Sequence, residues 1–193
     1  MQVGRDIMLI GIMGKTGSGK STITSYLNKD NKYEVIDVDK VNHKLLEMKE
    51  LKDEIIEKYD CLEDGVLNRK KLGMILYTDK EKMEEYNSLI WKYLEKELDK
   101  MINESNKPVI IDWMMLPLTK FYDMCDIKIL VESNWNIRLK RVLMRDNVDK
   151  EHFTARDKNG LDYKKEDMDF IIDNTGGVDK DEVKSIRKCI SLL

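Results

Sequence analysis

The chain has 193 residues, of which 41% are hydrophobic and 37% charged, a size and balance that fit one domain with small insertions. Its 34 Lys and Arg nearly balance 37 Asp and Glu, giving a net charge of -3, which excludes a general electrostatic attraction to nucleic acid or to an acidic membrane surface. We therefore expect small-molecule partners, with neither nucleic acid nor membrane among them, and a monomer.

The sequence gives no sign of export or membrane insertion. No stretch approaches the ~20 apolar residues of a membrane-spanning helix, and residues 1–6 lack the layout of a signal peptide. Cys61, Cys125 and Cys189 are far apart and odd in number, which indicates reduced structural thiols. We expect a cytoplasmic protein.

Strands and helices are predicted to alternate along the chain, which is typical of a parallel sheet covered by helices on both faces. The spacing of apolar residues predicts strands over Ile7–Met13, Tyr33–Val38, Val109–Asp112, Ile127–Val131 and Phe170–Ile172. Helices are predicted over Gly19–Leu27, Asp39–Tyr59 with a break near Lys49, Asn68–Tyr77, Asp79–Glu104, Asn134–Asp146, Asp149–Arg156 and Asp179–Ser191.

These elements predict an α/β fold with a five-stranded parallel sheet and two interruptions. Residues 1–38, 106–133 and 168–193 would form the core that holds the sheet. Residues 39–105 would form a helical insertion, and residues 134–167 a small lid.

A phosphate-binding loop follows the first predicted strand and precedes a helix. Gly14 to Ser21 matches G-x-x-x-x-G-K-[ST] at every fixed position. Backbone N–H groups of such a loop, together with the helix N-terminus, hold phosphate oxygens. Lys20 would reach the β- and γ-phosphates of ATP, and the Ser21 hydroxyl would bind Mg²⁺. The predicted ATP-binding residues are Gly14, Thr16, Gly17, Ser18, Gly19, Lys20, Ser21 and Thr22.

The loop predicts a nucleotide but does not specify the reaction. A GTPase also needs a guanine-reading Asn-Lys-x-Asp segment, which this chain lacks. Residues 157–160 and 173–176 fit a loose D-x-x-G pattern, but neither lies where a switch segment would be. A kinase is therefore favoured over a GTPase.

Three carboxylates end predicted strands, where open α/β sheets bind ligands. Asp37 and Asp39 close the second strand, and we expect one of them to face the site. A carboxylate there can bind magnesium or accept a proton from an attacking hydroxyl, although Asp39 could instead cap a helix. Asp112 ends the third strand, with a position near the metal or a structural role both open.

Arginines gather in the predicted lid. Arg138, Arg141 and Arg145 share one helical face, and Arg156 follows in the next helix. Arginines can stabilise the charge that develops on a transferred phosphoryl group. The alternative is a solvated face paired with local acids. His43, four residues past Asp39, could face the acceptor or the solvent.

Several segments, in order, resemble the dephospho-CoA kinase family. The segments are residues 10–22 around the phosphate loop, Val35–His43, Asp64–Gly73, Arg141–Asp146 with Arg156, and Ile171–Gly176. The resemblance implies a P-loop kinase fold of three layers, with a nucleotide core, a CoA-side helical insertion and a lid. It implies phosphorylation of the ribose 3′-hydroxyl of dephospho-CoA by ATP with Mg²⁺.

The resemblance also implies roles for individual residues. The implied catalytic residues are Asp39 as general base, Lys20, Arg141, Arg145 and Arg156; the adenine side is Asn174 and Gly176; the acceptor side is Asp39, His43, Arg69 and Asp112; the magnesium ligands are Ser21 and Asp37.

Three segments depart from the family pattern. Trp91-Lys92 stands where a His-Pro pair is expected, residues 112–118 differ from the expected segment, and residues 157–160 replace an expected glutamine. The first two changes fall on the acceptor side. A kinase of another nucleoside or nucleotide, or an inactive ATP-binding regulatory homologue, therefore remains an alternative.

Overall fold

The computed structural model describes residues 7–63, 65–146, 148–158 and 160–192, without the side chains of residues 69, 70, 77, 78 and 156. The chain divides into two compact units. One unit runs up to Asp37 and resumes at Ser105, and the other comprises Val38–Glu104.

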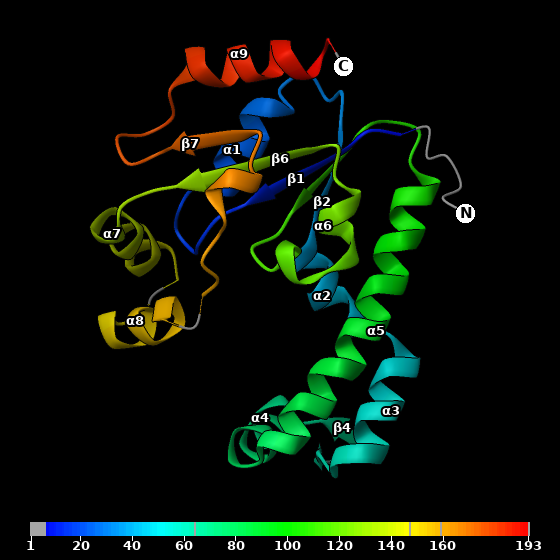
Figure 1. The fold of residues 1–193 in the computed structure, drawn as a ribbon. Coiled ribbons are helices and arrows are strands. Elements are labelled where there is room, and N and C mark those ends of the chain that lie inside the picture. The colour runs from blue at the N-terminus through cyan, green and yellow to red at the C-terminus, as the bar shows by residue number, and fades with distance from the viewer. Residues whose placement is uncertain (1–6, 64, 147, 159, 193) are drawn as a thin grey trace. The chain divides into compact units, whose positions relative to one another are not determined.

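The first unit is built on a five-stranded parallel sheet with the order β2-β5-β1-β6-β7 (Figure 1). This sheet confirms the predicted fold class, and every strand overlaps its predicted range. Because β1 lies at the centre, the loop that follows it emerges in the middle of one sheet edge. The strands are β1 (Leu9–Met13), β2 (Glu34–Asp37), β5 (Val109–Asp112), β6 (Ile127–Glu132) and β7 (Phe170–Asp173).

One face of this sheet is covered by α1 (Lys20–Leu27) and α9 (Lys180–Ile190). Ile10 and Ile12 of β1 are fully buried there, in one cluster with side chains from both helices. Successive strand residues point to opposite faces, so this pair anchors β1 from a single side.

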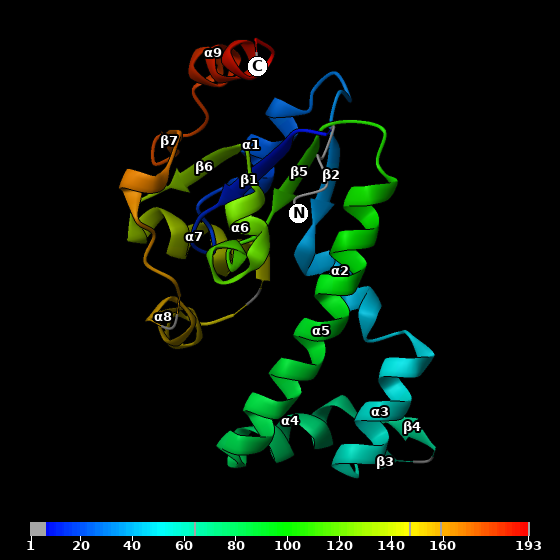
Figure 2. The ribbon, with the colours of Figure 1, turned by 45° about the vertical axis from the view of Figure 1, so that its right-hand side comes forward.

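The other face is covered by the 3-10 turn η1 (Leu116–Leu118) and the short helix α6 (Lys120–Met124) (Figure 2). Gly11 permits their close approach, because a Cβ there would lie 2.7 Å from Leu116 Cδ2 and 2.9 Å from Cys125 Sγ. Neither η1 nor α6 was predicted from the sequence.

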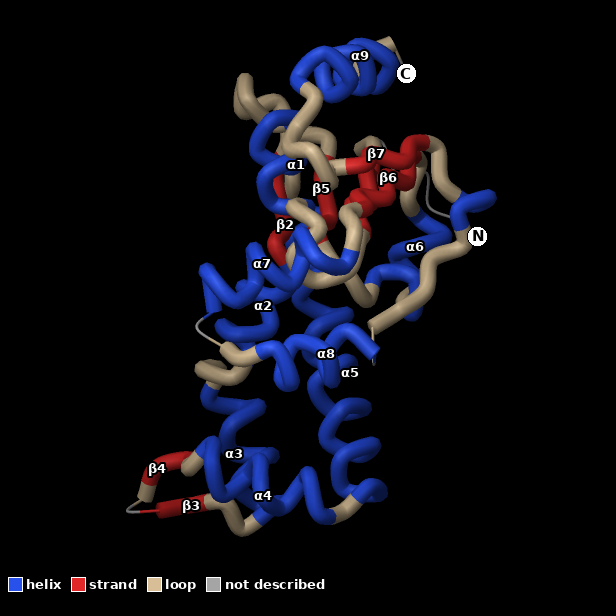
Figure 3. Tube along the Cα trace, turned by 90° about the vertical axis from the view of Figure 1, so that its left-hand side faces the viewer, coloured by secondary structure: helices blue, strands red, loops and turns tan. Residues whose placement is uncertain are grey.

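The segment between β6 and β7 contains α7 (Trp135–Asp146), α8 (Lys150–Lys158) and the 3-10 turn η2 (Lys165–Asp167). The first two helices pack against each other (Figure 3). Each begins after a polar cap, since Asn134 accepts a 2.9 Å hydrogen bond from Ile137 N and Asp149 accepts a 2.7 Å bond from His152 N.

The second unit is helical, with one short hairpin. Tyr93 of its long helix donates a 2.9 Å hydrogen bond to Glu54, and Tyr59 meets Tyr86 edge-on. The predicted break near Lys49 is confirmed, whereas the hairpin was not predicted. The elements are α2 (Val38–Leu45), α3 (Lys49–Tyr59), β3 (Leu62–Glu63), β4 (Val66–Leu67), α4 (Arg69–Thr78) and α5 (Lys80–Glu104).

One sequence inference about Asp39 is wrong. Asp37 ends β2, but Val38 already begins α2, and Asp39 lies in the first turn of that helix. Asp39 therefore does not close the strand, although the helix predicted to begin at Asp39 begins only one residue earlier.

Across the described part of the chain, no helix combines the length and apolar character needed to cross a membrane.

Candidate nucleotide-binding site

The loop between β1 and α1 has a conformation that its glycines make possible. Gly17 and Gly19 have φ values of 80° and 98°, in the left-handed region that other residues rarely adopt. A Cβ on Gly14 would lie 2.2 Å from the Val131 carbonyl oxygen. The Ser18 N–H donates a 3.0 Å hydrogen bond to the Lys15 carbonyl, which closes a turn. Left-handed residues in such a loop allow successive N–H groups to turn toward a bound phosphate.

The residues that end the loop carry the groups expected to meet phosphate and metal. Lys20 begins α1, and its Nζ donates a 3.0 Å hydrogen bond to the Gly14 carbonyl. Ser21 and Thr22 are exposed in the first turn, where the helix dipole favours an anion. Thr16 is buried, with its hydroxyl 3.9 Å from the Met114 sulfur. Its side chain therefore packs inside the protein.

Two carboxylates lie beside the loop, at the carboxyl ends of neighbouring strands. Asp37 of β2 is in register with Asp112 of β5, and β5 pairs directly with β1. Asp112 is buried and accepts a 3.0 Å hydrogen bond from Thr24 of α1. That bond holds one Asp112 carboxylate oxygen against α1, the helix that follows the phosphate loop.

Oxygen-bearing side chains beside the loop have the chemistry to bind Mg²⁺. Among the described residues, no group of three or more His, Cys, Asp or Glu side chains lies together as a metal cage. Mg²⁺ keeps several waters and is usually held by one or two protein oxygens plus substrate phosphates. Ser21, Asp37 and Asp112 supply such oxygens.

The predicted arginines differ in what they contact. Arg141 bonds the loop itself: its guanidinium donates to the carbonyls of Gly17 at 3.3 Å, Ser18 at 3.2 Å and Asn174 at 2.7 Å. Arg145 is exposed and forms an ion pair with its neighbour Asp146. The side chain of Arg156 lies outside the described residues. Arg141 therefore joins the loop to the segment after β7.

Asn174 anchors the segment after β7 to the phosphate loop and to β6. Asn174 is buried, its side-chain amide donates a 2.8 Å hydrogen bond to the Ser18 carbonyl, and its N–H donates to the Glu132 carbonyl. Gly176 and Gly177 are exposed, and a Cβ on either would meet nothing within 4 Å. Of the predicted adenine-side residues, Asn174 is therefore buried and supports the loop, whereas Gly176 is exposed.

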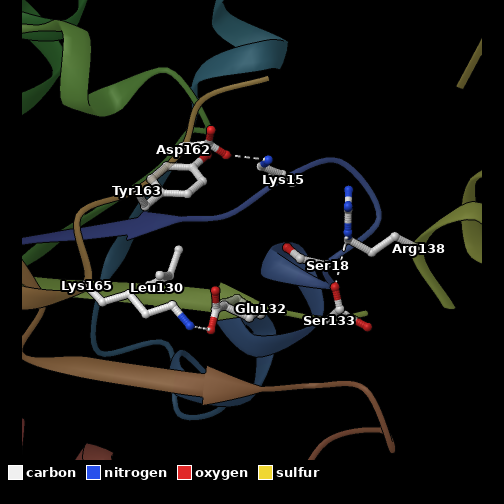
Figure 4. Close-up of a pocket in the computed structure, with 10 residues that line it drawn as sticks. Lys15, Ser18, Leu130, Glu132, Ser133, Arg138, Asp162, Tyr163 and Lys165 are labelled. Carbon is white, nitrogen blue, oxygen red and sulfur yellow. Dashed lines mark hydrogen bonds and ion pairs between the residues drawn. The ribbon is translucent and has the colours of Figure 1, made fainter. Parts of the chain in front are cut away.

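A cavity of about 300 Å³ lies between the loop and the segment that follows α8 (Figure 4). Lys15 forms a 2.7 Å ion pair with Asp162 there, and Lys165 pairs with Glu132 at 2.5 Å. Tyr163 is partly buried, and its hydroxyl donates to the Met114 carbonyl at 2.9 Å. Burial raises the pKa of the Tyr163 hydroxyl, so it remains a donor at neutral pH.

Sequence reasoning missed this cavity and most of its lining. Asp162 and Tyr163 belong to no motif, and their partners are 147 and 49 residues away. Asp157 was interpreted as part of a weak D-x-x-G match and of the segment that replaces an expected glutamine, yet it pairs with Arg138. Adjacent helices often form ion pairs with each other. The acidic partner of an arginine on α7 could therefore have been sought on the next helix, α8.

The remaining predicted residues belong to the second unit. Asp39 and His43 are both exposed on α2. Arg69 begins α4, and its side chain lies outside the described residues. Their roles stay predictions.

The family model and the curated relatives indicate one family. A model of the dephospho-CoA kinase family matches residues 8–180. A dephospho-CoA kinase from Listeria innocua is 32% identical over 181 residues, covering 89% of this chain and 90% of that protein. The fold is shared with TT1252 from Thermus thermophilus (TM-score 0.79, 22% identity, 97% and 98% of the two chains). It is also shared with the Campylobacter jejuni dephospho-CoA kinase (TM-score 0.60, 19% identity, 95% of each chain). This chain belongs to the dephospho-CoA kinase family.

Proposed function

We propose that this protein transfers the γ-phosphoryl group of ATP to the ribose 3′-hydroxyl of dephospho-CoA, which yields CoA and ADP. The observation that carries the proposal is the phosphate loop, folded with its glycines in left-handed conformations at the N-terminus of α1 in a chain of this family.

The loop and its neighbours bind and orient the triphosphate. Backbone N–H groups and the α1 N-terminus hold phosphate oxygens, and Lys20 neutralises charge on the β- and γ-phosphates. Ser21, together with Asp37 or Asp112, would hold Mg²⁺, which would neutralise charge on the phosphates when bound. Asn174 and Gly176 support and border the adenine side.

The acceptor hydroxyl needs a base and a closed site. In this proposal Asp39 takes the proton of the 3′-hydroxyl as the O–P bond to the γ-phosphorus forms and the bond to ADP breaks. Arg145 and Arg156 of the lid meet the transferred group, while Arg141 holds the loop in shape. His43, Arg69 and Asp112 lie on the acceptor side. Exclusion of water by the lid prevents wasteful ATP hydrolysis.

We further propose that the protein works in the cytoplasm as a monomer. No disulfide joins its three cysteines, as is usual for proteins of a reducing compartment.

The test is a coupled assay of ADP release with Mg²⁺-ATP and dephospho-CoA, run beside a panel of nucleosides and nucleotides. We expect dephospho-CoA to be the preferred acceptor, and the product to carry its new phosphate on the 3′-oxygen. Turnover confined to a different acceptor would point to the altered segments at Trp91 and Trp113. ATP binding with no acceptor-dependent ADP release would identify a regulatory homologue.

A further inference from the structure

Arg138 connects four parts of the nucleotide-binding unit through one guanidinium group. Its Nε donates to the Ser133 carbonyl at the end of β6 at 3.1 Å, and one terminal nitrogen donates to the Thr16 carbonyl of the phosphate loop at 3.3 Å. The two terminal nitrogens also bond the two oxygens of Asp157 on α8, at 2.5 and 3.1 Å. The guanidinium lies 5.8 Å from the centre of the Phe153 ring.

This ion pair is largely buried. The exposed fractions of the Arg138 and Asp157 side chains are 8% and 13%. By comparison, those of Arg187 and Asp30, an Arg–Asp pair elsewhere in the same unit, are 23% and 51%. A buried pair with a bidentate geometry fixes both partners, and loss of one leaves an uncompensated charge.

The phosphate loop also rests directly on the backbone of α7. A Cβ on Gly17 would lie 2.8 Å from the Arg138 carbonyl oxygen and 2.9 Å from Val142 Cγ2. The first helix of the predicted lid is thus packed against the loop, and it cannot swing away from the loop without breaking these contacts.

We propose that Arg138 is a positioning residue that sets the Thr16–Gly17 turn of the phosphate loop, and that its pair with Asp157 holds α8 in place over the ATP site. The aromatic contact between Trp135 and Phe153, with ring centres 5.6 Å apart, closes the same α7–α8 interface. One guanidinium then couples the position of α8 to the shape of the loop. The proposal rests on ATP binding as part of the proposed function, but not on the identity of the acceptor.

The test compares Arg138→Gln, Arg138→Lys, Asp157→Asn and the double variant Arg138→Gln/Asp157→Asn, with Arg187→Gln as the matched control. Three quantities are measured: the affinity for Mg²⁺-ATP by calorimetry, the acceptor-independent release of ADP, and the thermal unfolding midpoint. We expect Arg138→Gln to weaken ATP binding about tenfold or more. Arg138→Lys keeps the charge but not the fork, and should recover part of this loss.

Asp157→Asn should act mainly on α8. We expect a smaller loss of ATP affinity together with a higher acceptor-independent ADP release relative to acceptor-dependent turnover, because water enters a loosened site. The double variant should bind ATP no more weakly than Arg138→Gln alone, since both changes remove one shared contact. Arg187→Gln should lower the unfolding midpoint without changing either functional quantity.

A purely structural pair would give a different result. If Arg138→Gln kept its ATP affinity within about twofold of the unmodified protein while its midpoint fell as in Arg187→Gln, the positioning role would be refuted. Additive effects in the double variant would refute the shared contact. Should Arg138→Gln not fold, the lysine and Asp157→Asn variants decide by the same criteria. If the protein binds ATP but does not phosphorylate dephospho-CoA, the proposed function fails while this test still stands.

Discussion

The side-chain amide of Asn174 donates a 2.8 Å hydrogen bond to the carbonyl of Ser18, joining the segment after β7 to the phosphate loop 156 residues earlier. Both residues are buried, and the Asn174 carbonyl accepts a 2.7 Å bond from Arg141, which also contacts the Ser18 carbonyl. Gly19 completes the contact, since a Cβ there would lie 2.0 Å from the Asn174 amide nitrogen. Asn174 therefore stabilises the conformation of the phosphate loop through the Ser18 carbonyl.

Asn174→Ala removes that support. The Ser18 carbonyl would keep its bond from Arg141 but lose the one from Asn174, and such a hydrogen bond typically contributes about 0.5–1.5 kcal/mol. Part of the binding free energy of ATP would then be needed to order the loop. We expect the affinity for Mg²⁺-ATP, measured by calorimetry, to fall about tenfold. Asn28→Ala is the matched control, because the Asn28 side chain also bonds the backbone, accepting a 3.0 Å hydrogen bond from the Tyr33 N–H. Equal ATP affinity in the two variants would contradict the support.

Lys20→Ala removes the loop lysine that is expected to neutralise charge on the γ-phosphate. Because charge shifts between the phosphates in the transition state, we expect turnover to fall at least ~10²-fold, with a smaller loss of ATP affinity. The coupled ADP-release assay measures this. Lys29→Ala, an exposed lysine just beyond α1, should retain normal turnover. Near-normal turnover of Lys20→Ala would remove this lysine from the mechanism.

The phosphate loop and the sheet were predictable because both depend on local signals. The glycine spacing of Gly14 to Ser21 requires particular backbone angles, and those angles are present at Gly17 and Gly19. Apolar runs of strand length mark buried parallel strands. Caps such as Asn134 and Asp149 act on residues two or three positions away, so a single segment contains the whole signal.

Contacts between distant segments were not predictable in the same way. The partner of Arg138 lies 19 residues away and that of Asn174 lies 156 residues away, and no periodicity encodes such pairs. Asp39 was expected at the end of the second strand, whose predicted range ran to Val38. Instead, the chain turns into α2 immediately after Asp37, and a short apolar run cannot mark that change by periodicity alone.

Acid should weaken the fold through Asp157. The hydrogen bonds from Arg138 hold the pKa of this carboxyl below its ordinary value, with burial opposing. A carboxyl whose pKa is lowered by folding contributes stability that is full above its unfolded pKa of about 3.9 and is lost as the pH falls through the folded pKa. Urea unfolding of the unmodified protein and of Asp157→Asn should therefore differ most at neutral pH. The difference should shrink below about pH 4, and a difference independent of pH would contradict the ionised pair.

The choice of catalytic base lies between Asp37 and Asp39, and the two substitutions should have separable effects. Asp39→Asn keeps the size of the side chain but cannot accept the hydroxyl proton, so we expect normal Mg²⁺-ATP affinity and a loss of about 10²-fold or more in phosphoryl transfer to dephospho-CoA.

Asp37→Asn should act through the metal instead. Asp37 ends β2 in register with Asp112, beside the phosphate loop, where a carboxylate can bind magnesium or its waters. Its rate should therefore recover as the Mg²⁺ concentration is raised, whereas that of Asp39→Asn should not. The measurement is a magnesium titration of turnover for each variant at saturating ATP. If raised Mg²⁺ restored Asp39→Asn while Asp37→Asn stayed slow, the two roles would be exchanged, with Asp37 as the base.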